Sequence, residues 1–229
     1  MGLIGDPKNR IPLIGILGGT FNPIHYGHLR MAQELTDALS FDEVHFIPSA
    51  NPPHKPTPQV TAEHRAAMVR LGISSNPIFK FDGRELHRKG ASYTIDTLQS
   101  LRDELGNDAS LVLLMGSDAF TKLNTWHRWE ELIQLCHIAL AQRPLTSENE
   151  ALKKQPLPKI LETFLHNHYT ENGDDLHESA AGFITMQSIT ALDISSTAIR
   201  QALQHKHSAR YLMPDSVIDY IYTHQLYDL

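Results

Sequence analysis

Two histidines three residues apart, His25 and His28, are the side chains of this sequence best suited to chemistry on a phosphate group. They end the peptide Gly-Gly-Thr-Phe-Asn-Pro-Ile-His-Tyr-Gly-His, which starts at Gly18 directly after an apolar run. Glycines let a backbone turn sharply and approach a ligand, and the first turn of a helix offers free N–H groups to an anion. Imidazoles placed there can donate hydrogen bonds to phosphate oxygens, so the peptide predicts a phosphate-binding turn.

Two other interpretations of the histidine pair stay open at this point. An i, i+3 pair can bind zinc, although no third or fourth ligand is spaced nearby. The chain has 14 histidines, so a surface pair could also arise by chance. The dinucleotide fingerprint Gly-x-Gly-x-x-Gly and the Walker lysine loop are both absent from the sequence. The phosphate interpretation is favoured because strand, glycines, proline and histidines follow one another in the required order.

A second polar peptide, Asp193-Ile-Ser-Ser-Thr-Ala-Ile-Arg200, lies near the C-terminus. Ser195 or Ser196 can cap a helix, which leaves other hydroxyls and free amides at the helix start. Arg200 lies one turn further along, on the same side as Ser196. Hydroxyls, amides and a guanidinium together predict a second anion site. The alternative is an ordinary capped helix with a solvated arginine.

The elements that must position these peptides alternate between strands and helices. Apolar runs predict strands at 12–17, 44–47, 78–81, 111–115, 137–141 and 182–186. Helical spacing predicts helices from 27, from 61, at 94–105, 126–135 and 157–168, from about 196, and at 214–224. Such alternation is typical of an α/β fold, a Rossmann-like doubly wound parallel sheet with helices on both faces. Ligands of such sheets lie beyond the carboxyl ends of the strands, where both polar peptides fall.

Length and composition predict one domain over residues 1–229, with a polar excursion at 146–180 and a C-terminal helical part at 190–229 that carries the second motif. A net charge of -6 argues against binding of duplex nucleic acid. The single cysteine, Cys136, excludes an internal disulfide and is expected to be an inert core thiol. No apolar run is long enough to span a membrane, so we expect a cytoplasmic protein. The oligomeric state is not predicted.

Taken together, the two motifs resemble those of the bacterial nicotinate mononucleotide adenylyltransferases. The resemblance extends from about Leu13 to Tyr227. The His-x-Gly-His element alone would indicate only the wider nucleotidyltransferase superfamily, which includes pantetheine-phosphate adenylyltransferases and cytidylyltransferases. The Ile-Ser-Ser-Thr-x-Ile-Arg element narrows the resemblance to the pyridine nucleotide enzymes. The resemblance to this family implies a parallel sheet of the nucleotidyltransferase type.

The resemblance also implies a role for each matching residue. Three residues would be catalytic: His25, His28 and Arg200. The residues that would bind ATP are Gly18, Gly19, Thr20, Phe21, Gly27, Lys55, Ser195, Ser196 and Thr197. Those that would bind the mononucleotide are Asn51, Tyr93, Thr94, Asp118, Trp126 and Arg143, with Trp126 stacked on the pyridine ring. Mg²⁺ would accompany ATP without a dedicated protein site.

Structural interpretations of the same residues stay open beside these roles. Lys55 and Arg143 could be solvated surface cations, Thr94 and Asp118 could cap helices, and either Trp126 or Trp129 could belong to the core. Relatives carry an aromatic residue where this chain has His127, so a side-chain role there is doubtful.

The implied reaction joins ATP and nicotinate mononucleotide, giving deamido-NAD and pyrophosphate. The acceptor could instead be nicotinamide mononucleotide or another phosphorylated small molecule. A non-catalytic nucleotide-sensing module is a further alternative, which the intact set of motif residues disfavours. A nucleic-acid-binding role is disfavoured by the acidic charge balance and the lack of a basic run.

Overall fold

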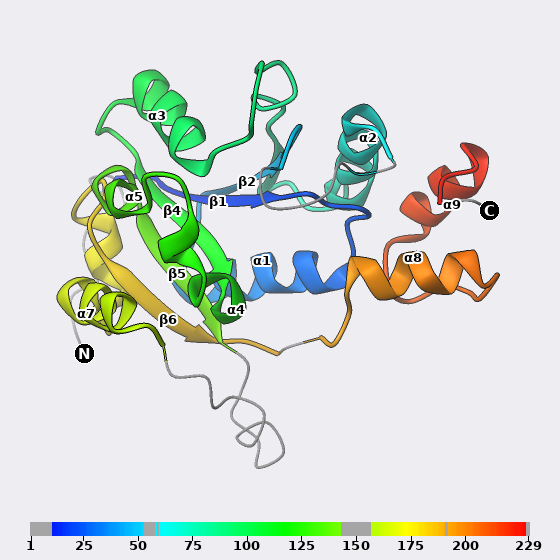
Figure 1. Cartoon of the computed structure of the whole chain (residues 1–229). Coiled ribbons are helices and arrows are strands. Elements are labelled where there is room, and N and C mark those ends of the chain that lie inside the picture. The colour runs from blue at the N-terminus through cyan, green and yellow to red at the C-terminus, as the bar shows by residue number, and fades with distance from the viewer. Residues whose placement is uncertain (1–10, 53–57, 59, 143–156, 191, 228–229) are drawn as a thin grey trace, which may run out of the picture.

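Six parallel strands form one sheet at the centre of the molecule (Figure 1). The computed structural model describes residues 11–52, 58, 60–142, 157–190 and 192–227. The strands are β1 (Leu13–Gly19), β2 (Glu43–Pro48), β3 (Phe79–Phe81), β4 (Ser110–Gly116), β5 (His137–Gln142) and β6 (Ile184–Ser188). Their order is β3-β2-β1-β4-β5-β6, and every neighbouring pair is parallel. The predicted doubly wound parallel sheet is confirmed.

The helices connect the strands and flank the sheet. The α-helices are α1 (Tyr26–Leu39), α2 (Ala62–Ile73), α3 (Thr94–Leu105), α4 (Ser117–Phe120), α5 (Leu132–Leu135), α7 (Lys159–His168), α8 (Ser196–Gln204) and α9 (Asp215–Thr223). Three short 3-10 helices are η1 (Leu123–Thr125), η2 (Trp129–Glu131) and η3 (Gly173–His177). Thr61 caps α2 by accepting the His64 N–H, and α3 ends before Gly106, whose φ is 59°.

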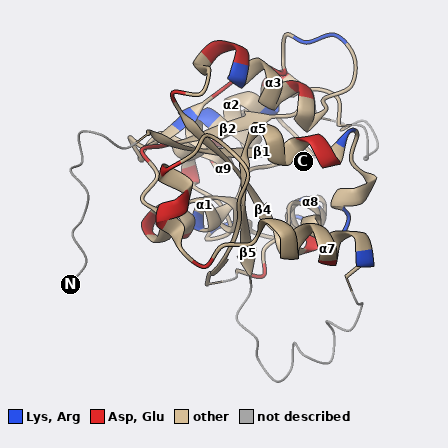
Figure 2. Ribbon diagram, turned by 90° about the vertical axis from the view of Figure 1, so that its left-hand side faces the viewer, with Lys and Arg blue, Asp and Glu red and all other residues tan. Residues whose placement is uncertain are grey.

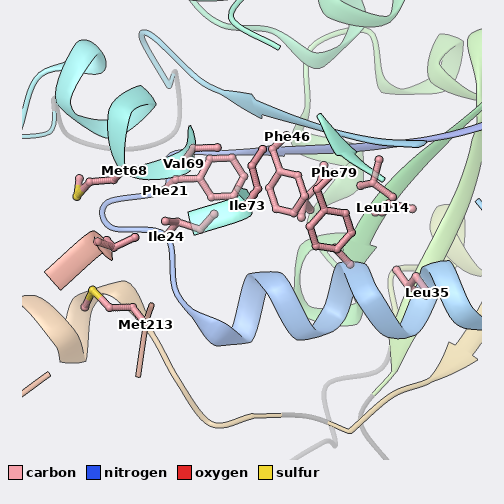
Figure 3. Close-up of a cluster of buried hydrophobic side chains, with 14 of the residues drawn as sticks. Phe21, Ile24, Leu35, Phe46, Met68, Val69, Ile73, Phe79, Leu114 and Met213 are labelled. Carbon is pink, nitrogen blue, oxygen red and sulfur yellow. The ribbon is translucent and has the colours of Figure 1, made fainter. Parts of the chain in front are cut away.

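Side chains of each strand alternate between two apolar layers, one on each face of the sheet. On β4, Val112 and Leu114 face one layer and Leu111, Leu113 and Met115 face the other. Helices α1, α2, α8 and α9 contribute to the first layer, part of which is drawn in Figure 3. Helices α3, α5 and α7 contribute to the second. These layers hold the strand ends, and therefore the polar loops that follow them, in fixed places.

Charged residues lie mainly on the helices and loops around the sheet, where Figure 2 shows both signs interspersed. None of the helices in the described residues is both long enough and apolar enough to cross a membrane. Cys136 is fully buried, and burial raises the pKa of its thiol to about 12. This environment agrees with the inert core thiol expected from the sequence.

The helix expected at 126–135 is wrong as a single element. The chain instead forms η2 and α5, because Arg128 adopts a left-handed conformation with φ 52°. Both its Nε and Nη2 donate to the carboxylate of Glu131, at 2.7 and 2.5 Å. This turn interrupts the helical path between Trp126 and α5.

The second half of the polar excursion expected at 146–180 contains the helix expected at 157–168, observed as α7. Residues 143–156 lie outside the described residues, but 157–180 pack on the domain. Leu161 of α7 and Leu176 of η3 are both fully buried. The Thr170 N–H also donates to the Ile184 carbonyl at 2.9 Å, which brings this segment to the edge of the sheet. Strand β6 starts at Ile184, two residues later than expected, after Gly182 with φ 118°.

Candidate active site

A cavity of about 450 Å³ opens at the carboxyl ends of β1 and β4. These two strands are neighbours, and the chain order of the sheet reverses between them. Ligands of doubly wound sheets bind at such a switch point. The end of β1 contributes Gly18, Gly19 and Thr20 to the lining, and β4 contributes Gly116. The cavity therefore lies where the sequence places the phosphate-binding turn.

His28 lines the cavity, and its ring is fixed by the backbone of the other histidine. Its Nδ1 accepts the His25 N–H at 3.3 Å. A backbone N–H can only donate, so Nδ1 must be the unprotonated nitrogen and Nε2 carries the proton of the neutral ring. His28 therefore carries an N–H donor at Nε2, the orientation of its ring is fixed through Nδ1, and the residue lines the cavity.

His25 lies behind His28 and is not part of the cavity lining. Its side chain belongs to a residue only 5% exposed, and the two ring centroids are 3.8 Å apart. Burial lowers the pKa of His25 to about 4, which keeps it neutral at pH 7. Gly27 makes room for this ring, since a Cβ there would lie 2.9 Å from His25 Nδ1. The two rings are therefore in contact, tilted by 31°, with His28 at the cavity and His25 supporting it.

Phe21 belongs to the core and does not line the cavity. The residue is 2% exposed, and its ring points into the apolar cluster beside Val69 and Phe46 (Figure 3). The ring also meets His28 edge-on at 5.1 Å. A Cβ at Gly19 would lie 3.0 Å from the Phe21 ring, whereas one at Gly18 would meet no atom within 4 Å. Gly19 is thus needed for packing, while Gly18 leaves open space in front of the turn.

The second motif is hydrogen-bonded directly to the first. Nη1 of Arg200 donates to the Asn22 carbonyl at 2.8 Å, and the Ser196 hydroxyl donates to the Pro23 carbonyl at 2.9 Å. The peptide bond between Asn22 and Pro23 is cis. Nη2 of Arg200 also reaches the Thr197 hydroxyl at 3.3 Å. The start of α8 therefore fastens the phosphate turn, and the other N–H groups of the guanidinium can serve a ligand.

Ser195 caps α8, because its hydroxyl accepts the Ala198 N–H at 3.1 Å. Ser195, Ser196, Thr197 and Arg200 do not line the cavity described above. They lie beside the turn and contact its backbone or one another.

The opposite side of the cavity is formed by the loops before and after α3 and β4. Thr94, the first residue of α3, and Trp126 both line it, as does Lys122. Trp129 is elsewhere, with its ring edge-on to Phe164 at 5.1 Å. Both tryptophans pack against the second apolar layer, and of the two only Trp126 also lines the cavity.

A buried carboxyl group, Glu85, also lines this side and was not foreseen. The residue is 6% exposed, and its Oε1 accepts the Thr97 hydroxyl at 2.7 Å. Burial raises the pKa of Glu85, although the bond from Thr97 opposes that shift. Glu85 lies in an irregular segment, so neither a helical or strand period nor a motif indicated a role for it in the sequence. The one available signal was that this glutamate comes shortly before Ser92, Tyr93 and Thr94.

Asn51 is placed near the cavity without lining it. Its side-chain amide donates to the Gly90 carbonyl at 3.0 Å, and its backbone exchanges bonds with Ser92 at 2.9 and 3.2 Å. These bonds join the loop after β2 to the loop before α3. Asn51 thus shapes the rim in this structure.

The other residues expected to bind the mononucleotide lie outside the cavity lining or outside the described residues. The Tyr93 ring contacts His127 in a tilted arrangement with centroids 4.4 Å apart, and Asp118 is exposed at the start of α4. Neither Tyr93 nor Asp118 lines the cavity. Lys55 and Arg143 lie outside the described residues.

No three histidine, cysteine, aspartate or glutamate side chains gather as metal ligands within the part of the chain that is described. The histidine pair therefore has no third protein ligand there, which weakens the zinc interpretation.

Comparison with known proteins agrees with this fold and site. A family model described as cytidylyltransferase-like matches residues 16–202, which assigns the chain to the nucleotidyltransferases. A probable nicotinate-nucleotide adenylyltransferase of Dechloromonas aromatica (strain RCB) is 45% identical over 214 residues, covering 93% of this chain and 97% of the relative. Another, of Pseudomonas putida (strain W619), is 46% identical, covering 93% and 94%. The chain belongs to the nicotinate-nucleotide adenylyltransferase family.

A solved structure extends the likeness of fold to a distant protein. Plasmodium falciparum nicotinic acid mononucleotide adenylyltransferase, complexed with NaAD, superposes with a TM-score of 0.69. The sequences are 18% identical, and the match covers 95% of this chain and 98% of that one.

Proposed function

We propose that this protein transfers AMP from ATP to nicotinate mononucleotide, forming deamido-NAD and releasing pyrophosphate. One observation carries the proposal: at the switch point of the sheet, the His28 ring and the glycine turn share one cavity with Thr94 and Trp126. The cavity can therefore accept a phosphate chain at one side and a flat ring at the other. The names of the 45–46% identical relatives support the same acceptor.

The reaction needs no nucleophile from the protein. A phosphate oxygen of the mononucleotide attacks the α-phosphorus of ATP in line, and the bond from that phosphorus to the bridging oxygen of pyrophosphate breaks. The protein has to align two polyanions and stabilise the charge that moves onto the leaving group. Nε2–H of His28 is suited to the second task because Nδ1 is already fixed by the His25 N–H. His25 would act by supporting that ring.

The remaining cationic contacts follow from the second motif and the loops. Arg200 would contact the β- and γ-phosphates with the N–H groups that Asn22 and Thr197 do not use. Gly18, Thr20 and the start of α8 would offer backbone and hydroxyl donors beside it. Lys55 and Arg143 would add charge from their loops.

Mg²⁺ is proposed to arrive with ATP as part of the substrate. This ion usually keeps several waters and binds through substrate phosphates with few protein ligands. The described residues offer no three-carboxylate or histidine cluster that would hold it independently.

The mononucleotide side depends on one aromatic surface and one helix start. Trp126 would stack on the pyridine ring. Thr94 begins α3, where free N–H groups and the helix dipole favour the anionic carboxylate of nicotinate over a neutral amide. Asn51, Tyr93 and Asp118 would complete the acceptor site if their loops close around the ligand.

A substrate panel tests this proposal. The protein is incubated with Mg·ATP and, in separate reactions at equal concentration, nicotinate mononucleotide, nicotinamide mononucleotide and phosphopantetheine, and pyrophosphate release is measured. We expect the highest kcat/KM with nicotinate mononucleotide. Faster turnover of the amide would reassign the acceptor, and no pyrophosphate release with any acceptor would contradict the enzymatic function.

A further inference from the structure

Arg65, on α2, is a fully buried cation beside the phosphate turn. The residue is 1% exposed, and burial lowers its pKa, although an arginine stays protonated in proteins. Among the described residues, no carboxylate lies within the 4.0 Å of an ion pair with its guanidinium. Glu63, Glu85 and Tyr227 are the groups that favour its charge from further away.

The guanidinium instead bonds to two backbone carbonyls. Nη1 donates to Thr20 at 2.7 Å, and Nη2 donates to Ala50 at 3.1 Å. Thr20 follows β1 and lines the cavity, and Ala50 follows Ser49, which also lines it. One side chain therefore ties together the loops after β1 and β2, and Arg65 itself does not line the cavity.

A buried charge without a counter-ion is costly. Removing an ion from water carries a penalty of several kcal/mol, which carbonyl dipoles offset only in part. Nε of Arg65 is buried and has no hydrogen-bond partner within the described residues. Nη1 of Arg65 contacts Thr20, which lines the cavity, so an anion bound in the cavity would lie against the loop that Arg65 holds.

Arg200 makes the same kind of contact two residues further along the turn. Its Nη1 donates to the Asn22 carbonyl, while that of Arg65 donates to Thr20. Two arginines, from α2 and α8, therefore contact alternate carbonyls of one loop. A loop held in this way presents its other side, and the positive potential behind it, to the cavity.

We propose that Arg65 is a positioning residue for the phosphate chain: it fixes the loops after β1 and β2, and its buried charge is balanced by the polyphosphate bound in front of them. The identity of that polyphosphate, ATP and its leaving group, rests on the proposed function. The positioning itself concerns any pyrophosphate-like anion in the cavity.

Arg102 provides a matched control. It also donates to backbone carbonyls, of Leu135, Gly106, Ala109 and Ala180. Ala109 precedes β4, so this arginine lies at the amino end of that strand, opposite to the cavity. Loss of its charge should reduce stability without changing the phosphate site.

The test is a calorimetric titration of inorganic pyrophosphate into the wild type, Arg65→Lys, Arg65→Gln and Arg102→Gln, with kcat and KM for ATP measured in parallel. Arg65→Gln should bind pyrophosphate roughly tenfold more weakly or worse, because an uncompensated charge contributes on the order of 1 kcal/mol or more at this range. Arg65→Lys keeps the positive charge but cannot donate to both the Thr20 and the Ala50 carbonyl with the geometry of the guanidinium. It should bind pyrophosphate within about threefold of the wild type and lose mainly kcat. Arg102→Gln should lower Tm and leave the Kd unchanged.

Two results would overturn the positioning role. One is an unchanged pyrophosphate Kd in Arg65→Gln. The other is unfolding of both Arg65 variants, which would make the residue part of the core alone. Failure of the proposed function looks different: the wild type would bind pyrophosphate in an Arg65-dependent manner yet release none from ATP with any pyridine mononucleotide.

Discussion

His28 accepts the His25 N–H at Nδ1, and its Nε2–H is the proposed donor to the phosphate chain. Replacement by asparagine places an acceptor near the position of Nδ1 but removes the donor at Nε2. We expect His28→Asn to fold normally and to lose about 10² to 10³ in kcat, the usual effect of removing one preorganised donor. Steady-state kinetics and thermal unfolding measured on the same preparation check this.

His28→Gln is the complementary variant, since its amide can donate near the position of Nε2 but cannot accept the His25 N–H. It should keep more activity than His28→Asn and be slightly less stable. Equal kcat in the wild type and His28→Asn would exclude the proposed donor.

Gly27 and Gly18 differ in what an added methyl group would meet. At Gly27 it would press on the buried His25 ring, at 2.9 Å from Nδ1, whereas at Gly18 nothing lies within 4 Å. We expect Gly27→Ala to lose about 1–3 kcal/mol of stability, the usual cost of overpacking, and to lower kcat by displacing His25. Gly18→Ala should keep its stability and raise the KM for ATP, because its Cβ enters the cavity. Denaturant unfolding and kinetics of both variants distinguish the two effects; equal stability of the two would contradict the packing argument.

The residues of the two motifs could be found from sequence because their types and order are unusual. Arg65 and Glu85 could not be found from the sequence, because a charged residue in a helix or an irregular loop is normally solvated. Only the fold reveals that both are buried beside the cavity. His25 shows a further limit of prediction from sequence. The spacing of the two histidines predicted that both rings lie at the turn, but only the packing shows that His28, and not His25, lines the cavity.

At the level of elements, the turn after β1 is held by segments from the far end of the chain. The Tyr227 hydroxyl donates to Asn22 Oδ1 at 2.8 Å, next to the carbonyl that Arg200 contacts. Tyr227 is 4% exposed, and burial raises its pKa, so the phenol stays protonated as a donor.

Tyr227→Phe removes this single bond while keeping the ring. We expect a loss of about 0.5–1.5 kcal/mol in the free energy of unfolding, with a several-fold lower kcat because Asn22 is freed. Urea unfolding and kinetics measure the two effects, and Tyr222→Phe, an exposed tyrosine of α9, is the control. A change in stability with no change in kcat would show that this bond does not position the turn.

The positions of the strands and most element boundaries followed from the sequence because apolar runs and helix caps are local signals, whereas the strand order came from the structure. The errors fall where backbone conformation departs from the local pattern. Arg128 interrupts a helix by taking a left-handed conformation, and Gly182 delays β6. The packing of Leu176 is a tertiary effect that a polar segment does not indicate.

For the whole molecule, two buried histidines predict a loss of stability in acid. Burial lowers the pKa of both His25 and His137 to about 4, against about 6.5 in an unfolded chain. Between pH 6.5 and 4 the unfolded state therefore binds protons that the folded state does not, and stability falls as pH falls. Each histidine can contribute up to about 3 kcal/mol. Burial keeps His137 neutral, and its Nδ1 accepts the Phe183 N–H, whereas the bond from Nε2 to the Ser179 carbonyl opposes the lowering of the pKa.

His45 should act in the opposite direction. Burial disfavours its charge, but two carboxylates outweigh burial and raise its pKa: Asp82, 3.8 Å from Nδ1, and Glu43, hydrogen-bonded to Nε2 at 3.0 Å. Its contribution is thus complete below pH 6.5 and is lost as pH rises through the folded-state pKa. Urea unfolding at pH 7 and 4.5 should show a smaller acid loss in His137→Asn than in the wild type, and a larger one in His45→Asn. The same acid loss in all three proteins would contradict these assignments.

The bonds at Asn22 join residues that are 178 and 205 positions apart in sequence. A ribosome makes the histidine turn well before its anchors, Arg200 and Tyr227, which follow all six strands in sequence. During most of synthesis, the emerging chain therefore has both imidazoles but lacks the groups that hold Asn22 in place. Nascent chains, and fragments cut before α8, should not consume ATP, so turnover begins only after translation has reached the end of the fold.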